Sequence, residues 1–255
     1  MKKDQMTLAY VNMYAVFGAI PKLCELIPEA RELIAGQNIT LGFSVKGGPA
    51  ATLVFRDGVC SLREGAAGAV IRLGFSTPEK FNGMIDGTVT PIPNLRGLFH
   101  LGFLLRHFMP LTDILSRYLR ASDADLADGE FFNRSTELML HVIAGAVATI
   151  GNHDTVGRVS ASYIKDGNIF VGIADGPSVA VAAKDHRLAV ISEPIGQKKC
   201  LSYMIFRDMH TARDLFDGRV NAVVSVGLGD IRIGGMISQI DNVNRILDRV
   251  SYYLA

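Results

Sequence analysis

The stretch MIDGTV at residues 84–89 has a close counterpart in LFDGRV at residues 215–220. The match extends upstream without a gap, because LGFSTPEKFNGMIDG aligns with MIFRDMHTARDLFDG and pairs Phe75 with Phe206. Self-similarity at a fixed spacing is typical of duplicated structural units. The spacing here is close to half of the 255-residue chain, so it predicts two copies of one domain-sized unit.

The match continues in both directions from this stretch. VKGGPAATLVFRD (45–57) aligns with IADGPSVAVAAKD (173–185), and DILSR (113–117) aligns with RILDR (245–249). The alternative is two unrelated domains that share a helix–strand–helix pattern. We expect an N-terminal domain over 1–121, a small acidic linker over 122–130 and a C-terminal domain over 131–255, since domains cluster at about 100–150 residues.

The composition indicates a globular protein, with 49% hydrophobic residues, 20% charged residues and a formal net charge of +1. A balance near zero gives no basic face for a nucleic acid. The three widely spaced cysteines predict free thiols rather than disulfides or a zinc site. The apolar stretches 7–20 and 137–150 are shorter than the roughly 20 residues that a bilayer span needs. We therefore expect a cytoplasmic protein that does not span a membrane, and a buried helix at the start of each copy.

Short runs of β-forming residues follow each opening helix, separated by turn sequences such as KGGP and KDG. Such runs predict hairpin-linked strands and a mostly antiparallel sheet. The expected fold class is α+β, with two tandem copies of a mainly antiparallel sheet covered by helices. The predicted strands are ITLGFSV (39–45), ATLVF (51–55) and AVIRLGF (69–75) in the first copy, and RVSASYI (158–164), NIFVGI (168–173), SVAVAA (178–183), LAVIS (188–192) and CLSYMIF (200–206) in the second.

The opening motif itself predicts a short helix that stops at a glycine. Thr77 fits the N-cap, Pro78 the first helical position, and Gly87 the left-handed position after the end. The second copy repeats the stop at Gly218. The aspartates of the two Asp-Gly pairs are therefore expected to be structural rather than catalytic.

Each copy is expected to close with a strand and an amphipathic helix. Alternating apolar residues predict strands over 99–103 and 231–235. By this alignment Phe103 and Gly235 occupy the same place, which predicts a roomier interior in the second copy. On that hypothesis, replacing Gly235 by Phe blocks ligand binding and leaves the fold intact.

The order of these elements resembles the sterol carrier protein type two lipid-transfer domain, over residues 69–103 and again over 200–235. The resemblance implies an apolar tunnel for fatty acyl chains, acyl-thioesters or sterols between sheet and helices. The residues it implies for ligand binding are Leu215, Phe216, Ile231, Ile233, Gly235, Met236, Ile240 and Leu247 in the second copy, and Phe81, Met84, Ile85, Leu101, Phe103, Phe108 and Leu115 in the first.

Sequence motifs of catalysis are absent: there is no nucleophile elbow, zinc-binding HExxH, Walker loop or dinucleotide-binding glycine pattern. His153 and Asp154 are adjacent but are expected in a solvated loop. We predict a non-enzymatic protein without a cofactor or metal that binds a lipid or another apolar small molecule. Two alternatives stay open: an accessory module with filled cores that presents a surface to an enzyme partner, and a lipid-modifying enzyme. A protein partner and a homodimer are both compatible with the sequence.

Overall fold

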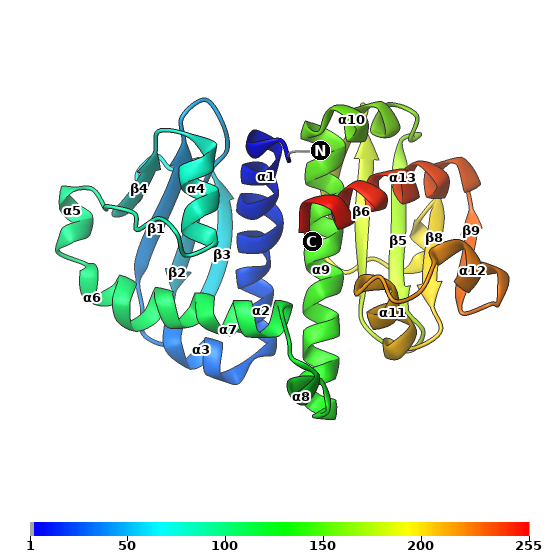
Figure 1. Cartoon of the computed structure of the whole chain (residues 1–255), viewed down its shortest axis with the longest axis horizontal. Coiled ribbons are helices and arrows are strands. Elements are labelled where there is room, and N and C mark those ends of the chain that lie inside the picture. Colours follow the sequence, from blue (N-terminus) through cyan, green and yellow to red (C-terminus); the bar gives the residue numbers. More distant parts are fainter. Residues whose placement is uncertain (1–2, 255) are drawn as a thin grey trace. The chain divides into compact units, whose positions relative to one another are not determined.

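The computed structural model describes residues 3–254, and the chain divides into two compact units between Leu138 and Met139 (Figure 1). The division falls within the long helix α9 (Gly129–His153). Each unit contains one β-sheet and its own set of helices, so the predicted α+β class with two sheets is confirmed.

The N-terminal unit has a four-stranded sheet in the order β3-β2-β1-β4. Its strands are β1 (Ile39–Val45), β2 (Ala50–Arg56), β3 (Val59–Glu64) and β4 (Ile71–Phe75). β2 is antiparallel to both of its neighbours, whereas β1 and β4 run parallel. The sequence pattern predicts the other three strands but not β3.

The C-terminal unit has a five-stranded sheet in the order β7-β6-β5-β8-β9. Its strands are β5 (Gly167–Ile173), β6 (Ser178–Lys184), β7 (Arg187–Val190), β8 (Ser202–Phe206) and β9 (Ile231–Gly235). The first four repeat the order and directions of the N-terminal sheet, and β9 adds an antiparallel edge beside β8. Both sheets are mainly antiparallel, as predicted.

The main helices of each unit cover one face of its sheet (Figure 1), and shorter helical segments connect them. In the N-terminal unit they are α1 (Gln5–Val11), a π-helical turn η1 (Asn12–Val16), a 3-10 turn η2 (Phe17–Ala19), α2 (Ile20–Leu26), α3 (Pro28–Ile34), α4 (Pro78–Ile85), α5 (Leu95–Leu98), α6 (Leu101–Phe103), a π-helical turn η3 (Leu104–Phe108), α7 (Met109–Leu119) and α8 (Asp123–Leu126). In the C-terminal unit they are most of α9, then α10 (Thr155–Ser162), a 3-10 turn η4 (Gln197–Lys199), α11 (Met209–Phe216), α12 (Ala222–Gly227) and α13 (Ile237–Leu254).

Matching backbone hydrogen bonds occur at aligned positions of the two sheets. Val45 N–H donates to the Pro49 carbonyl at 2.9 Å, and at the corresponding turn Ile173 N–H donates to the Pro177 carbonyl at 3.0 Å. The parallel pair ends at Val45 opposite Phe75 in one unit and at Ile173 opposite Phe206 in the other. The residues aligned by sequence therefore occupy matching places in the two sheets.

The quoted motif forms the predicted helix in both units. α4 starts after Thr77 and ends before Gly87, which has a φ of 72°, and Gly218 after α11 has a φ of 69°. These left-handed positions suit glycine because it has no Cβ. α11 is capped by Asp208, whose carboxylate accepts the Thr211 N–H at 2.7 Å. That bond is the main reason why the pKa of Asp208 falls to about 2.

Two predicted strands are wrong. Residues 99–103 form a turn at 99–100 and then α6, because Asn94 caps α5 by accepting the Gly97 N–H, and from α6 the chain is helical through η3 into α7. Residues 158–162 of the predicted strand RVSASYI lie in α10, whose N-terminus is capped by Asp154. The additional strand of the C-terminal sheet is instead β9, at the opposite edge of the sheet from β7.

Candidate functional site

The residues predicted to bind a ligand fall into three classes of exposure. Phe81, Phe103, Phe108, Leu115, Ile231 and Ile240 are buried. Met84, Ile85, Leu215, Phe216, Ile233, Met236 and Leu247 are half-buried, whereas Leu101 and Gly235 are exposed. Their role as ligand contacts stays a prediction, which rests on what surrounds them in each unit.

The interior of the N-terminal unit is packed with aromatic rings. The Phe17 ring lies 5.0 Å from Phe43, 6.1 Å from Phe81 and 6.0 Å from Phe108, between ring centroids. The Phe43 ring also lies 5.7 Å from that of Phe108. Since such contacts fill the space between the sheet and its helices, the predicted tunnel residues Phe81 and Phe108 belong to a packed core.

Smaller side chains stand at the matching places of the C-terminal unit. The sheet registers and the sequence alignment pair four phenylalanines with three alanines and a valine: Phe17 with Ala144, Phe43 with Val171, Phe55 with Ala183, and Phe81 with Ala212. At the place of Ile85 the C-terminal unit has Phe216, whose ring centroid lies 5.5 Å from that of Phe206. The C-terminal interior therefore contains less aromatic volume over the same sheet topology.

The helix-facing side of the C-terminal sheet is also more accessible. Phe43 is 0% exposed, whereas its counterpart Val171 is half-buried, although Ile169 and Ile173 on the same face of β5 are buried. On the closing helices, Leu115 is 3% exposed and its counterpart Leu247 is half-buried. We call these two apolar and partly accessible positions, Val171 on β5 and Leu247 on α13, the apolar wall.

A buried amide oxygen lies on the helix that carries part of this wall. Asn244 of α13 follows Ile240 by four residues and precedes Leu247 by three, so the three side chains share one face of the helix. Its Oδ1 atom is buried and accepts no hydrogen bond from the described residues. Leaving a buried acceptor unsatisfied is costly, so a water molecule or a ligand group would donate to this oxygen.

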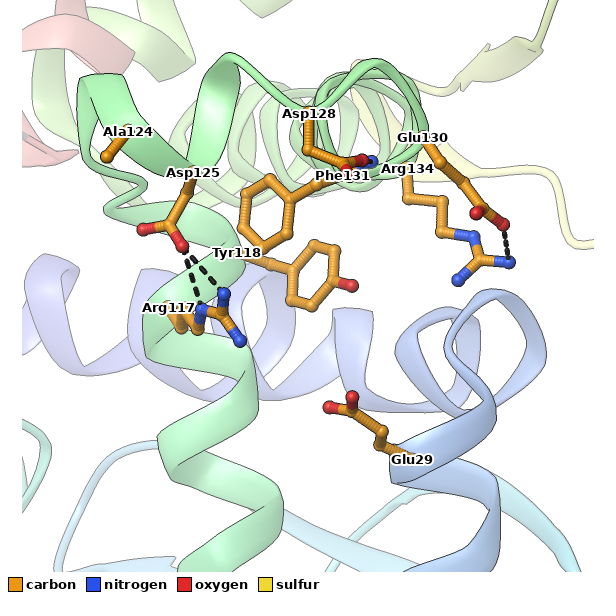
Figure 2. Close-up of a pocket in the computed structure, with 9 residues that line it drawn as sticks. All are labelled: Glu29, Arg117, Tyr118, Ala124, Asp125, Asp128, Glu130, Phe131 and Arg134. Atoms are coloured by element: carbon orange, nitrogen blue, oxygen red, sulfur yellow. Dashed lines mark hydrogen bonds and ion pairs between the residues drawn. The ribbon is translucent and has the colours of Figure 1, made fainter.

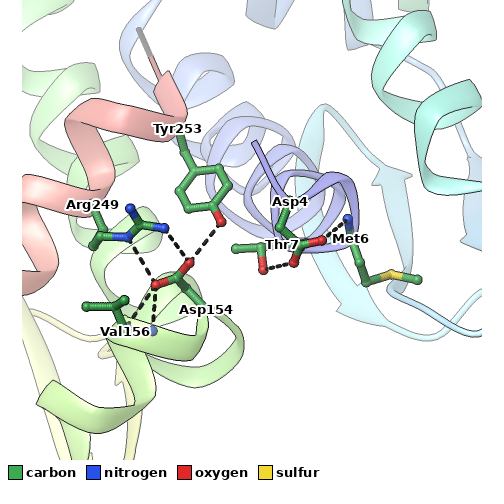
Figure 3. A network of polar contacts seen from close by, with 8 residues as sticks. Asp4, Met6, Thr7, Asp154, Val156, Arg249 and Tyr253 are labelled. Atoms are coloured by element: carbon green, nitrogen blue, oxygen red, sulfur yellow. Dashed lines mark hydrogen bonds and ion pairs between the residues drawn. The ribbon is translucent and has the colours of Figure 1, made fainter. Parts of the chain in front are cut away.

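The closing helix α13 is held to α10 by a buried carboxylate (Figure 3). Asp154 accepts hydrogen bonds from Arg249 at 2.8 and 3.1 Å, from the Tyr253 hydroxyl at 2.8 Å and from the Gly157 N–H at 2.9 Å. Burial alone would raise the pKa of Asp154, but these donors outweigh it and the pKa is lowered. The prediction of a solvated Asp154 is wrong, because this side chain is buried and its carboxylate accepts hydrogen bonds from α13 and from the start of α10.

Gly235 does not line the interior as predicted. Its φ is 80°, and a Cβ atom there would overlap the carbonyl oxygen of Leu201, the residue directly before the neighbouring strand β8. It has no counterpart at Phe103, which lies in a helix and contacts the Phe55 ring at 5.3 Å. The proposed replacement by Phe would distort β9 rather than fill a cavity.

We expect the Gly235→Ala variant to lose about 2 kcal/mol of unfolding free energy, because the left-handed conformation and the Leu201 contact both oppose a side chain. Gly196→Ala is the matched control, since Gly196 has a φ of −73° and open space around its Cβ position. Its unfolding free energy should change by less than about 0.5 kcal/mol. Urea unfolding measures both, and equal stabilities of the two variants would contradict this explanation.

The N-terminal unit has a surface hollow of about 270 Å³ with a charged lining (Figure 2). Its two arginines are already paired, Arg117 with Asp125 at 2.7 Å and Arg134 with Glu130. The Tyr118 and Phe131 rings stack at 4.2 Å between them. Paired charges around an aromatic stack do not suit an alkyl chain, so this hollow is not the candidate lipid site.

The described residues provide neither a metal site nor a membrane span. Within residues 3–254, no cluster of His, Cys, Asp and Glu is arranged to hold a metal ion. Nor does any helix in this range combine the length and the apolar character needed to cross a membrane. Cys24 and Cys60 are buried free thiols, as predicted, and Cys200 is half-buried.

Comparisons with known proteins give weak structural likenesses. No family model matches the chain, and no curated protein matches it. Among solved structures, it is similar to "UbiJ-SCP2 Ubiquinone synthesis protein", with 14% identity, a TM-score of 0.33, and coverage of 42% of this chain and 95% of that one. It is also similar to apo sterol carrier protein 2 from Yarrowia lipolytica, with 14% identity, a TM-score of 0.29, and coverage of 40% and 92%. At these values, membership of the sterol carrier family stays a proposal.

The sequence contained signals for the residues that the prediction missed. Extending the alignment of residues 45–57 upstream by two positions pairs Phe43 with Val171. Asp154 precedes a short helix in the position of an N-cap, and Arg249 was already aligned with Arg117. Nothing in the sequence pattern indicated that the Asn244 oxygen would lack a donor.

Proposed function

We propose that the C-terminal unit binds a lipid-like ligand without catalysis, in the apolar space between its sheet and the helices α11 and α13. A fatty acyl chain, an acyl-thioester or a sterol-like molecule fits the chemistry of this wall. Each buried CH₂ contributes about 0.8 kcal/mol, so an alkyl chain needs few polar contacts to bind. The observation that carries the proposal is Val171, which is half-buried where the other unit has a fully buried Phe43.

The unsatisfied Asn244 oxygen narrows the ligand chemistry. This oxygen accepts hydrogen bonds, so a ligand that contacts it would offer a hydrogen-bond donor next to α13. A sterol-type hydroxyl and the amide N–H groups of an acyl-thioester carrier both provide one. A purely hydrocarbon ligand does not.

The Val171→Phe variant tests the binding site directly. The other unit already has Phe at this place, so the variant should fold, and its ring should fill the proposed space. We expect its affinity for a fluorescent fatty acid to fall at least tenfold, because several CH₂ groups would lose their contacts. Val224→Phe, which adds the same ring at an exposed position of α12, is the control and should bind like the parent. Equal saturation curves for the parent and Val171→Phe would rule out this site.

The N-terminal unit favours a second function, that of an accessory module. Its Phe17–Phe43–Phe81–Phe108 cluster leaves the equivalent space filled, so its contribution is expected at its surface rather than in its interior. We also propose that the N-terminal domain ends at residue 121 and that the C-terminal domain begins at residue 131. Ligand stoichiometry separates the alternatives, since one site per chain fits a filled N-terminal core and two sites do not.

A further inference from the structure

The segment from Ile92 to Met109 exposes large apolar side chains along its whole length. It begins beside β4 and includes α5, α6 and η3. Its side chains that are more than 40% exposed are Ile92, Leu95, Leu98, Phe99, Leu101, Leu105 and Met109, with Phe99 at 89%. A patch of this size on a folded protein marks an interaction surface.

The opposite side of this 92–109 segment anchors it to the N-terminal unit. Phe103 and Phe108 are buried, and Gly97 packs closely against Pro93 and Ile71. The Asn94 side-chain oxygen accepts the backbone N–H groups of Arg72 and Gly97 at 2.9 and 3.1 Å. The segment is thus two-sided, and its exposed residues are not needed to fill the core.

The charges of the segment have one sign. No Asp or Glu occurs between Asp86 and Asp113, whereas Arg96 and Arg106 are exposed. The helix α3, which packs against η3, carries Glu29, Arg31 and Glu32. Arginines interspersed with exposed apolar side chains are typical of segments that lie in the interface of an anionic membrane.

The corresponding segment of the C-terminal unit has apolar residues but a different charge pattern. Val223, Val224, Leu228 and Ile237 are exposed. Asp230 lies within this segment, however, and pairs with Arg207, and just before the segment Arg219 pairs with Asp214 at 3.6 Å. This segment therefore lacks the attraction to negative lipids that the 92–109 segment has.

We propose that the 92–109 segment docks the protein onto the surface of an anionic lipid membrane. The apolar side chains insert among the lipids, and Arg96 and Arg106 contact the headgroups. Docking between two copies through this face is less favourable, because a twofold contact would bring the same arginines of both copies together. The proposal does not depend on a ligand inside the C-terminal unit.

Vesicle flotation of the full chain tests the proposal. The protein should float with vesicles that mix phosphatidylcholine and phosphatidylglycerol, and far less with phosphatidylcholine alone. The double variant Leu95→Ser/Phe99→Ser should weaken vesicle binding by about tenfold or more, because both side chains lie outside the core and would insert among the lipids. Arg96→Gln/Arg106→Gln should weaken it roughly twentyfold, and the remaining binding should be less sensitive to salt.

Val223→Ser/Leu228→Ser in the C-terminal unit is the matched control and should bind vesicles like the parent. Circular dichroism melting checks that each variant is folded, and fatty-acid titration checks that the interior site is unchanged. Equal binding to the two vesicle types, or no effect of either 92–109 variant, would overturn the proposal. So would a concentration-dependent dimer in sedimentation that Leu95→Ser/Phe99→Ser abolishes, because it would assign this face to a second copy.

Discussion

The Arg249→Ala variant should lose about 3 kcal/mol of unfolding free energy in the C-terminal unit, because it leaves the buried Asp154 carboxylate without its cation. The Asp154 and Arg249 side chains are only 5% and 19% exposed, and they join α10 to the closing helix. Hydrogen exchange during urea titration should show the amides of α13 and β8 losing protection together. Guanidinium contacts with the Tyr252 and Tyr253 rings, at 4.8 and 5.4 Å, would be lost as well.

Arg117→Ala is the matched control, since Arg117 has the same place in the repeat but its side chain is 58% exposed. Its loss should stay below about 1 kcal/mol, as for surface ion pairs. The pH dependence supplies a second check. The pKa of Asp154 is lowered, so its contribution is present above the unfolded pKa of about 3.9 and is lost as the pH falls through the folded pKa. The difference between Arg249→Ala and the parent should therefore shrink in acid, and a constant difference would contradict the assigned role.

Removing one ring from the N-terminal core should have a comparably large effect. The Phe43→Ala variant should lose about 3–5 kcal/mol, because Phe43 is fully buried and contacts the rings of Phe17, Phe81 and Phe108. Val171→Ala at the same place in the other unit should lose less than about 1.5 kcal/mol, since Val171 is already half-buried. Urea unfolding with unit-resolved hydrogen exchange measures both losses.

This comparison decides whether the two interiors differ in packing. Similar losses of unfolding free energy for Phe43→Ala and Val171→Ala would show that both interiors are equally filled, and the proposed binding space of the C-terminal unit would lose its support. If Val171→Ala loses unfolding free energy only when bound lipid is present, this result would instead identify Val171 as a ligand contact.

Much of the fold could be predicted because local signals and the repeat agree. Alternation and turn residues identified most of the strands, and the glycine stops identified α4 and α11. The strand predicted over 99–103 is wrong because the sequence pattern there is ambiguous. Leu95, Phe99 and Phe103 recur every four residues, as in a helix, while Phe99, Leu101 and Phe103 alternate, as in a strand. The Asn94 cap decides between them in the structure.

The candidate site was less predictable from sequence. The expectation of a roomier C-terminal unit rested on Gly235, but the structure places the smaller residues at Ala144, Val171, Ala183 and Ala212. Which aligned residues face the helices depends on strand register, and a side chain's exposure depends on packing far along the chain. The Asp154–Arg249 contact joins residues 95 positions apart, and no local pattern specifies it.

Native mass spectrometry of the gently purified full chain tests the central claim, that the C-terminal unit holds a lipid-like ligand. The parent and Val224→Phe should carry one ligand per chain, released by solvent extraction as a lipid. Val171→Phe should be folded and carry none. A parent without bound lipid that also fails to acquire one from added fatty acids, acyl-thioesters and sterols would contradict the claim, as would a Val171→Phe variant loaded to the same extent as the parent.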